Sequence, residues 1–225
     1  SRRVLVVTNI ETKEAKVLSG TSATTSVESF RWLNDNQLLL TRDGRAEIDS
    51  LSYYIIDKDG KNTELLLEAK KNKKKPGYEI PRVRGIYSKF PEKIMVSLRN
   101  NSSRTMSYYW LNLKTKEKTL IVRTPTIKNE VVYRFLFDHN GVAKGFLSYD
   151  TDGPDMGMVD SFYLYNEDGT FDQVGSCRHQ GACFQPLAFD VDNTTLLGVG
   201  QAVQSDGSIL DETDTNALWA YDTVS

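Results

Sequence analysis

The residue types that most often carry catalysis or bind metals are few in this sequence, and their spacing does not assemble a reactive centre. His139 lies in the segment Asp138–Gly141, where a polar residue beside glycine is typical of a turn. His179 lies between Cys177 and Cys183, and these three side chains would supply three zinc ligands, whereas structural zinc sites usually have four. Alternatively, Cys177 and Cys183 form a disulfide across a short loop or remain two unpaired thiols. We therefore predict no catalytic, cofactor-binding or metal-binding residue, and we expect no cofactor.

Acidic residues gather in two segments that lack the pattern of a strand. The segment from Asp150 to Gly153 begins like a calcium loop, because hard cations prefer clustered carboxylates. Pro154 occupies the next ligand position and Ser161 stands where a bidentate Glu is required, so the EF-hand pattern fails. We interpret both segments as solvated loops. Their acidic residues are Asp150, Asp152, Asp155 and Asp160 in the first and Asp206, Asp211, Glu212 and Asp214 in the second.

Three arginines, Arg31, Arg84 and Arg134, recur 53 and 50 residues apart, each inside an apolar segment. If these segments are equivalent strands of a repeat, the three guanidinium groups would line or rim a shared channel and favour carboxylates. Alternatively, they form ion pairs with the Asp residues at the ends of strands in neighbouring repeats.

Composition narrows the function classes. The 225 residues include 28 Lys plus Arg and 30 Asp plus Glu, a net charge of −2, whereas a nucleic-acid module is expected to carry a basic excess. The lysine-rich run 70–75 is best interpreted as a solvated linker. Apolar runs such as Val4–Val7 are much shorter than the roughly 20 residues that a membrane helix needs. We expect neither nucleic acid nor a membrane as a partner.

The elements that must position any site come from a repeat of about 50 residues. Five apolar segments end in Asn or Asp and are 48 to 56 residues apart, and they are Val6–Asn9, Tyr54–Asp57, Tyr109–Asn112, Tyr163–Asn166 and Trp219–Asp222. A second series interleaves with them, at Phe30–Asn34, Arg84–Ser88, Arg134–Asp138 and Pro186–Asp190. Each member of the second series is followed by another apolar strand. Polar turns that often contain Gly, such as Asp59-Gly60, separate the segments.

Four strands per repeat predict an all-β fold, a β-propeller of four-stranded antiparallel blades. Consecutive apolar residues such as Phe135, Leu136 and Phe137 suit strands that are covered on both faces. A β-sandwich is the alternative, but its strands are not expected to recur in phase. About four to five blades are present, as part of a ring of seven or eight.

Several of these segments resemble the N-terminal propeller of the prolyl oligopeptidase family of serine peptidases. The segments are Arg2–Thr12, Ser29–Thr41, Tyr54–Gly60, Phe162–Gly169 and Phe184–Leu197. The resemblance implies a non-catalytic propeller that caps an α/β-hydrolase domain and admits peptides while excluding folded proteins. It also implies two partners, the α/β-hydrolase domain of the parent polypeptide and the peptide substrates of that domain. Similar repeats occur in TolB-like propellers, so a standalone platform for protein interaction or ligand binding is the alternative.

The sequence departs from that family in one respect. The catalytic Ser of the family stands in a Gly-x-Ser-x-Gly elbow, and the nearest approach here, Gly20–Thr24, ends in Thr. We therefore expect the hydrolase domain to lie outside this sequence. Export to the periplasm or secretion from a bacterium is favoured over the cytoplasm.

We expect residues 1–225 to form a single propeller domain or a fragment of one. The expected boundaries are a partial blade at 1–18, complete blades at 26–69, 80–123 and 130–176, and a partial blade at 184–225. Long loops at about 42–52, 99–107, 150–161 and 201–216 should share one face. Since binding on rigid β scaffolds concentrates in long loops, that face is the expected binding face.

Overall fold

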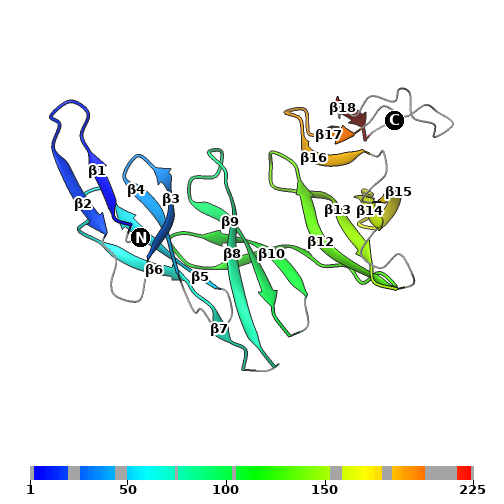
Figure 1. The fold of residues 1–225 in the computed structure, drawn as a ribbon, viewed down its shortest axis with the longest axis horizontal. Helices are drawn as coiled ribbons and strands as arrows, with labels where there is room; N and C mark the ends of the chain where they lie inside the picture. Colours follow the sequence, from blue (N-terminus) through cyan, green and yellow to red (C-terminus); the bar gives the residue numbers. More distant parts are fainter. Residues whose placement is uncertain are drawn as a thin grey trace. The chain divides into compact units, whose positions relative to one another are not determined.

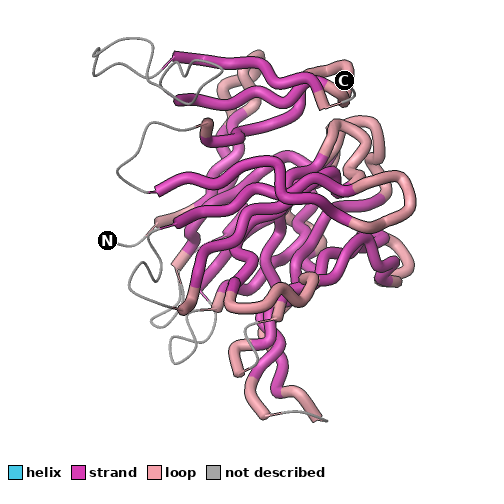
Figure 2. The backbone as a smooth tube through the Cα atoms, turned by 90° about the vertical axis from the view of Figure 1, so that its right-hand side faces the viewer, coloured by secondary structure: helices cyan, strands magenta, loops and turns pink. Residues whose placement is uncertain are grey.

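The computed structural model describes residues 3–19, 26–43, 50–73, 76–102, 105–152, 159–178, 184–200 and 217–223. Within these ranges the chain consists of strands, turns and connecting segments, without a helix (Figure 2). No helix that could span a bilayer occurs in this part of the chain. The chain divides into two compact units, Ser1–Arg123 (unit 1) and Thr124–Ser225 (unit 2).

Unit 1 contains a hairpin and two larger sheets, all antiparallel (Figure 1). The hairpin pairs β1 (Leu5–Thr8) with β2 (Ala15–Ser19). The first blade consists, in spatial order, of β3 (Val27–Asn34), β4 (Gln37–Asp43), β5 (Leu51–Asp57) and β6 (Thr63–Leu67). The second blade consists, in spatial order, of β7 (Lys70–Lys71), β8 (Tyr78–Ile86), β9 (Lys93–Asn100), β10 (Met106–Asn112) and β11 (Lys118–Arg123).

Unit 2 contains two antiparallel sheets. The third blade consists, in spatial order, of β12 (Glu130–Phe137), β13 (Ala143–Asp150), β14 (Val159–Tyr165) and β15 (Phe171–Arg178). The fourth blade consists of β16 (Gln185–Phe189), β17 (Thr195–Gly200) and β18 (Ala217–Asp222).

The leucine run in β4 shows why consecutive apolar residues form a strand here. Successive side chains of a strand point to opposite faces. Leu38 and Leu40 pack with Leu5 of the β1–β2 hairpin on one face. Leu39 packs with Ile94 of the second blade on the other face. The first blade is therefore covered on both faces, as the apolar runs predicted.

The Asn residues at the ends of β10 and β1 organise the turns that follow these strands. In the β10–β11 turn, the Asn112 Oδ1 atom accepts hydrogen bonds from the backbone N–H groups of Lys114 and Thr115, both at 2.9 Å. Asn9 makes equivalent bonds in the β1–β2 turn. Lys116 then adopts a left-handed backbone with φ 62°. A short-range Asx turn therefore explains why Asn or Asp recurs in the repeat.

The structure confirms the all-β class and the antiparallel blades of the sequence prediction. The lysine-rich run differs in part from its expected linker: Lys70 and Lys71 are exposed, but they pair with Glu79 and Tyr78 as β7. That residues 1–225 belong to one domain, and to a ring of seven or eight blades, stays a prediction.

Candidate functional site

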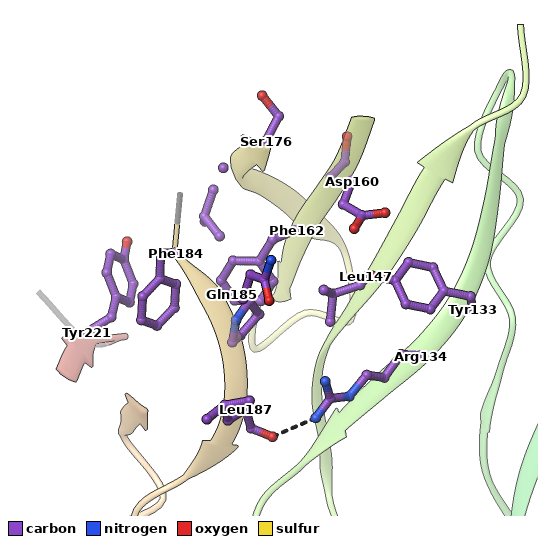
Figure 3. A pocket seen from close by; sticks show the side chains of 14 residues that line it. Tyr133, Arg134, Leu147, Asp160, Phe162, Ser176, Phe184, Gln185, Leu187 and Tyr221 are labelled. Carbon is purple, nitrogen blue, oxygen red and sulfur yellow. Dashed lines mark hydrogen bonds between the residues drawn. The ribbon is translucent and has the colours of Figure 1, made fainter. Parts of the chain in front are cut away.

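An apolar slot of about 340 Å³ lies in unit 2 between the third and fourth blades. We call it the inter-blade slot. Leu147 and Phe162 line it from the third blade, and Phe184, Leu187 and Tyr221 line it from the fourth (Figure 3). Polar groups among the lining side chains include those of Tyr133, Arg134, Asp160, Ser161, Ser176 and Gln185. Such a mixture of apolar walls and a few polar groups is typical of ligand sites.

One wall of the slot is a single row of cross-strand neighbours. Arg134 pairs with Leu147, Leu147 with Phe162, and Phe162 with Gly175, so one residue from each strand of the third blade faces the slot. A Cβ atom added at Gly175 would meet no atom within 4 Å. The row therefore ends in open space at β15.

A β-bulge in β12 adds Tyr133 to this wall. The register of β12 on β13 shifts between Val132 and Arg134, which leaves Tyr133 outside the ladder. In a regular strand, neighbouring residues point to opposite faces, whereas a bulge re-aims a side chain. Tyr133 and Arg134 are successive residues, and both line the slot.

Tyr133 and Asp160 form the polar pair of the slot. Burial raises the pKa of the Tyr133 phenol to about 12, with further contributions from the negative charge of Asp160 and from a hydrogen bond to it. The positive charge of Arg134 opposes this rise in pKa. The phenol therefore stays protonated at neutral pH and donates to the Asp160 carboxylate.

Arg134 and His139 connect the two blades of unit 2 through the carbonyl groups of β16. The Arg134 Nη2 atom donates to the Leu187 carbonyl oxygen at 2.8 Å (Figure 3). The His139 Nε2 atom lies 3.0 Å from the Phe189 carbonyl oxygen. In addition, the His139 backbone N–H donates to the Asn193 Oδ1 atom at 2.8 Å. Since β16 is the first strand of its sheet, these bonds engage polar groups along a sheet edge.

A second polar cluster is enclosed in the third blade. The Tyr163 hydroxyl donates to the Glu130 Oε1 atom at 2.9 Å, and the Ser148 hydroxyl donates to the other oxygen of Glu130. Burial, followed by the effect of Glu130, raises the pKa of Tyr163 to about 12. Ser148 is fully buried, so its hydroxyl is enclosed in the blade and is not placed to attack a substrate.

The three predicted arginines are exposed residues of β3, β8 and β12, but their partners differ. Arg84 bonds within its own blade, through Nε to the Ser97 hydroxyl at 2.8 Å and through Nη2 to the Met106 sulfur at 3.6 Å. Arg134 reaches the next blade, yet its partner is a carbonyl group rather than an Asp. For Arg31, the described residues provide no hydrogen bond or ion pair. A shared channel for the three stays a prediction.

The other predicted sites lie partly within and partly outside the described residues. His179 and Cys183 lie outside the described residues, as does the side chain of Cys177, so the zinc and disulfide alternatives stay predictions. The second acidic segment also lies outside them. No cluster of three His, Cys, Asp or Glu side chains suited to a metal ion occurs among the described residues.

The expected position of Asp160 was wrong. Sequence reasoning placed it in a solvated loop, whereas it belongs to β14 and lines the slot. The sequence pattern did not indicate Tyr133 or Gln185 as candidate site residues. The β-bulge in β12 brings Tyr133 to the same side as Asp160, and no residue type in β12 indicates where this bulge lies.

Comparison with known proteins places this geometry in a fold class. No protein-family model matches the chain, and no curated protein matches its sequence. The chain is similar in structure to oligogalacturonate lyase from Vibrio parahaemolyticus, with a TM-score of 0.59, 14% identity, and coverage of 97% of this chain and 54% of that one. It therefore spans about half the length of that structure.

Two solved peptidase structures also match. The β-propeller domain of the Trilobed protease from Pyrococcus furiosus has a TM-score of 0.52 and 10% identity, over 100% of this chain and 62% of that one. Acylaminoacyl peptidase from Pyrococcus horikoshii has a TM-score of 0.50 and 10% identity, over 98% of this chain and 34% of that one. At such identities the similarity shows the fold alone, and the predicted β-propeller is confirmed. Membership of the prolyl oligopeptidase family is not shown.

Proposed function

We propose that this chain is the non-catalytic propeller domain of a larger serine hydrolase of the prolyl oligopeptidase type. In this proposal it docks on an α/β-hydrolase domain elsewhere in the parent polypeptide and admits peptides while excluding folded proteins. The observation that carries the proposal is the match of the whole chain to the propeller domain of a protease. The absence of a Gly-x-Ser-x-Gly elbow from the sequence is consistent with a domain that binds and does not cleave.

The inter-blade slot gives this domain a place to hold part of a peptide. Phe162, Phe184 and Leu187 provide an apolar surface for a side chain. Asp160 provides a carboxylate, and a carboxylate has about four acceptor positions, so the Tyr133 hydroxyl does not saturate it. Peptides that carry a basic group beside an apolar side chain fit this arrangement.

The parent polypeptide provides the test of the hydrolase assignment. A fluorophosphonate probe, which reacts with activated serines, is expected to label the complete parent on a serine outside residues 1–225. The isolated 225-residue chain is expected to remain unlabelled. The parent should also cleave short peptides and leave a folded protein intact. A complete parent with no labelled serine would contradict the proposal.

The slot is tested separately in the same parent. Asp160→Asn should raise KM about tenfold for peptides that pair a basic with an apolar residue, because a hydrogen bond to a charged group contributes about 1.5–3 kcal/mol. The value of kcat should not change. Glu167→Gln, an exposed acid in the β14–β15 turn, is the matched control. An unchanged KM in Asp160→Asn would exclude the slot and leave the hydrolase assignment standing.

A further inference from the structure

Two large aromatic side chains on β3 are exposed beside buried leucines of the neighbouring strand. Phe30 is 51% exposed and Trp32 is 50% exposed. Their cross-strand partners in β4 are Leu40 and Leu38, which are both fully buried. Leu38 and Leu40 are covered by Leu5 of the β1–β2 hairpin. The hairpin therefore covers Val27 at the start of β3 together with β4, and it leaves Phe30 and Trp32 of β3 uncovered.

The other inter-blade contacts show what covers a first strand. In unit 2, Phe189 of β16 is only 3% exposed, because Leu136, Leu147 and Phe162 from β12, β13 and β14 pack against it. In unit 1, Leu33 and Leu39, from β3 and β4, pack against the second blade. In both cases, the first and second strands of one blade contribute to the cover of the next. These are the strands that the β1–β2 sheet lacks.

The hairpin corresponds to the third and fourth strands of a blade. Asn9 caps its turn as Asn112 caps the β10–β11 turn. Lys13 and Lys116 have the same left-handed φ of 62° in those two turns. β1 is therefore the counterpart of β10, which pairs with a strand on each side. Among the described residues β1 pairs with β2 alone.

A hollow of about 460 Å³ adjoins this incomplete sheet. Leu5 at the start of β1 and Val4 before it line one side, and Val27 and Phe30 of β3 line the other. The hollow is continuous with the interface at which Leu5 packs on Val27 and Leu40. A strand placed beside β1 would extend that interface across Phe30.

We propose that the edge of β1 that has no partner strand among the described residues, together with the Phe30–Trp32 face, binds an antiparallel pair of strands that completes the β1–β2 blade. The strand beside β1 would form backbone hydrogen bonds with it, and the outer strand of the pair would lay aliphatic side chains on Phe30 and Trp32. In the first and third blades, each strand pairs with the strand that precedes or follows it in the sequence. The pair is therefore supplied by the parent polypeptide on the N-terminal side of β1. This inference does not depend on the hydrolase assignment.

The decisive experiment compares the 225-residue chain with the parent polypeptide. Hydroxyl-radical footprinting reports the accessibility of single side chains, and it should show oxidation of Phe30 and Trp32 falling severalfold in the parent. Val191, which is 79% exposed in the β16–β17 turn, is the internal control and should be oxidised equally in both. Hydrogen exchange of the β1 amides should slow by at least about tenfold in the parent. Local opening of β1 would then have to break its pairing with a second neighbouring strand as well.

A pair of variants gives a second measurement. The double variant Phe30→Ser, Trp32→Ser should lower the Tm of the parent and leave the Tm of the 225-residue chain nearly unchanged, because both side chains are half exposed in the shorter chain. Ile10→Ser, at a residue 81% exposed in the β1–β2 turn, should leave both Tm values unchanged. Equal accessibility of Phe30, Trp32 and β1 in the two proteins would overturn the proposal. Protection of these residues through dimerisation of the 225-residue chain would also overturn it, since the occupant would then be a second copy.

Discussion

The first strand of the first blade and the first strand of the fourth blade differ in how much of their aromatic surface is exposed. Phe30 in β3 is 51% exposed, whereas Phe189 in β16 is 3% exposed. Each pairs with a fully buried leucine, Leu40 and Leu196 respectively. The strands β12–β14 pack on Phe189, whereas a two-stranded hairpin packs on the face of the first blade that carries Phe30. The neighbouring sheet, rather than the strand itself, therefore decides whether its aromatic face is core or surface.

The strongest test of this comparison truncates both aromatic side chains in the 225-residue chain. Phe189→Ala should reduce the free energy of unfolding of unit 2 by about 3–5 kcal/mol, because it removes a buried ring and leaves a cavity. Phe30→Ala should change the stability of unit 1 by no more than about 0.5 kcal/mol. Urea denaturation followed by fluorescence measures both. Equal losses for the two variants would contradict the comparison.

A smaller effect is expected from the polar connection between the third and fourth blades. Arg134→Met keeps much of the aliphatic stem and removes the donor to the Leu187 carbonyl oxygen, so unit 2 should lose about 0.5–1.5 kcal/mol. Arg31→Met, at an exposed residue of β3, is the matched control and should change stability by less than about 0.5 kcal/mol. The same denaturation assay applies. A loss in the control as large as in Arg134→Met would mean that the inter-blade hydrogen bond is not the cause.

The raised phenol pKa values predict a loss of stability at high pH. Tyr133 and Tyr163 have pKa values of about 12, above the ordinary 10.0, so the folded state holds both protons more tightly than the unfolded state. Their contribution to stability is complete below pH 10 and is lost as the pH rises through 12. Tyr133→Phe and Tyr163→Phe should each reduce the decline between pH 10 and pH 12. Denaturation curves across this pH range measure the decline in the free energy of unfolding. A decline as steep in both variants as in the unmodified protein would contradict the prediction.

The smallest effect concerns the polar pair of the slot. Asp160→Asn removes a negative charge that raises the pKa of Tyr133, so this pKa should fall. It should stay above its ordinary value because burial is the largest cause of the shift. Ultraviolet titration of the phenolate, with Tyr133→Phe to identify the signal, measures the change. Glu167→Gln should leave the titration unchanged, and a similar shift in that control would refute the assignment to Asp160.

Much of the fold could be predicted because its signals are local. Asn112 organises its turn through amides only two and three residues away, so the recurring Asn or Asp marks the hairpin directly. The alternation of Leu38, Leu39 and Leu40 between two packed faces follows from strand geometry. The slot offered no such signal. Its polar pair joins residues of β12 and β14 across β13, and its far wall comes from another blade.

The sequence by itself determined the strands, the turns and their period, because an Asx turn and the alternation of a strand depend on residues a few positions apart. Only the tertiary structure decided that Tyr133 meets Asp160, that His139 reaches the carbonyl of Phe189, and that Phe30 is left uncovered. These outcomes depend on a bulge that re-aims one side chain and on the cover that a neighbouring sheet provides. Both are set by packing between segments that are tens of residues apart in the chain.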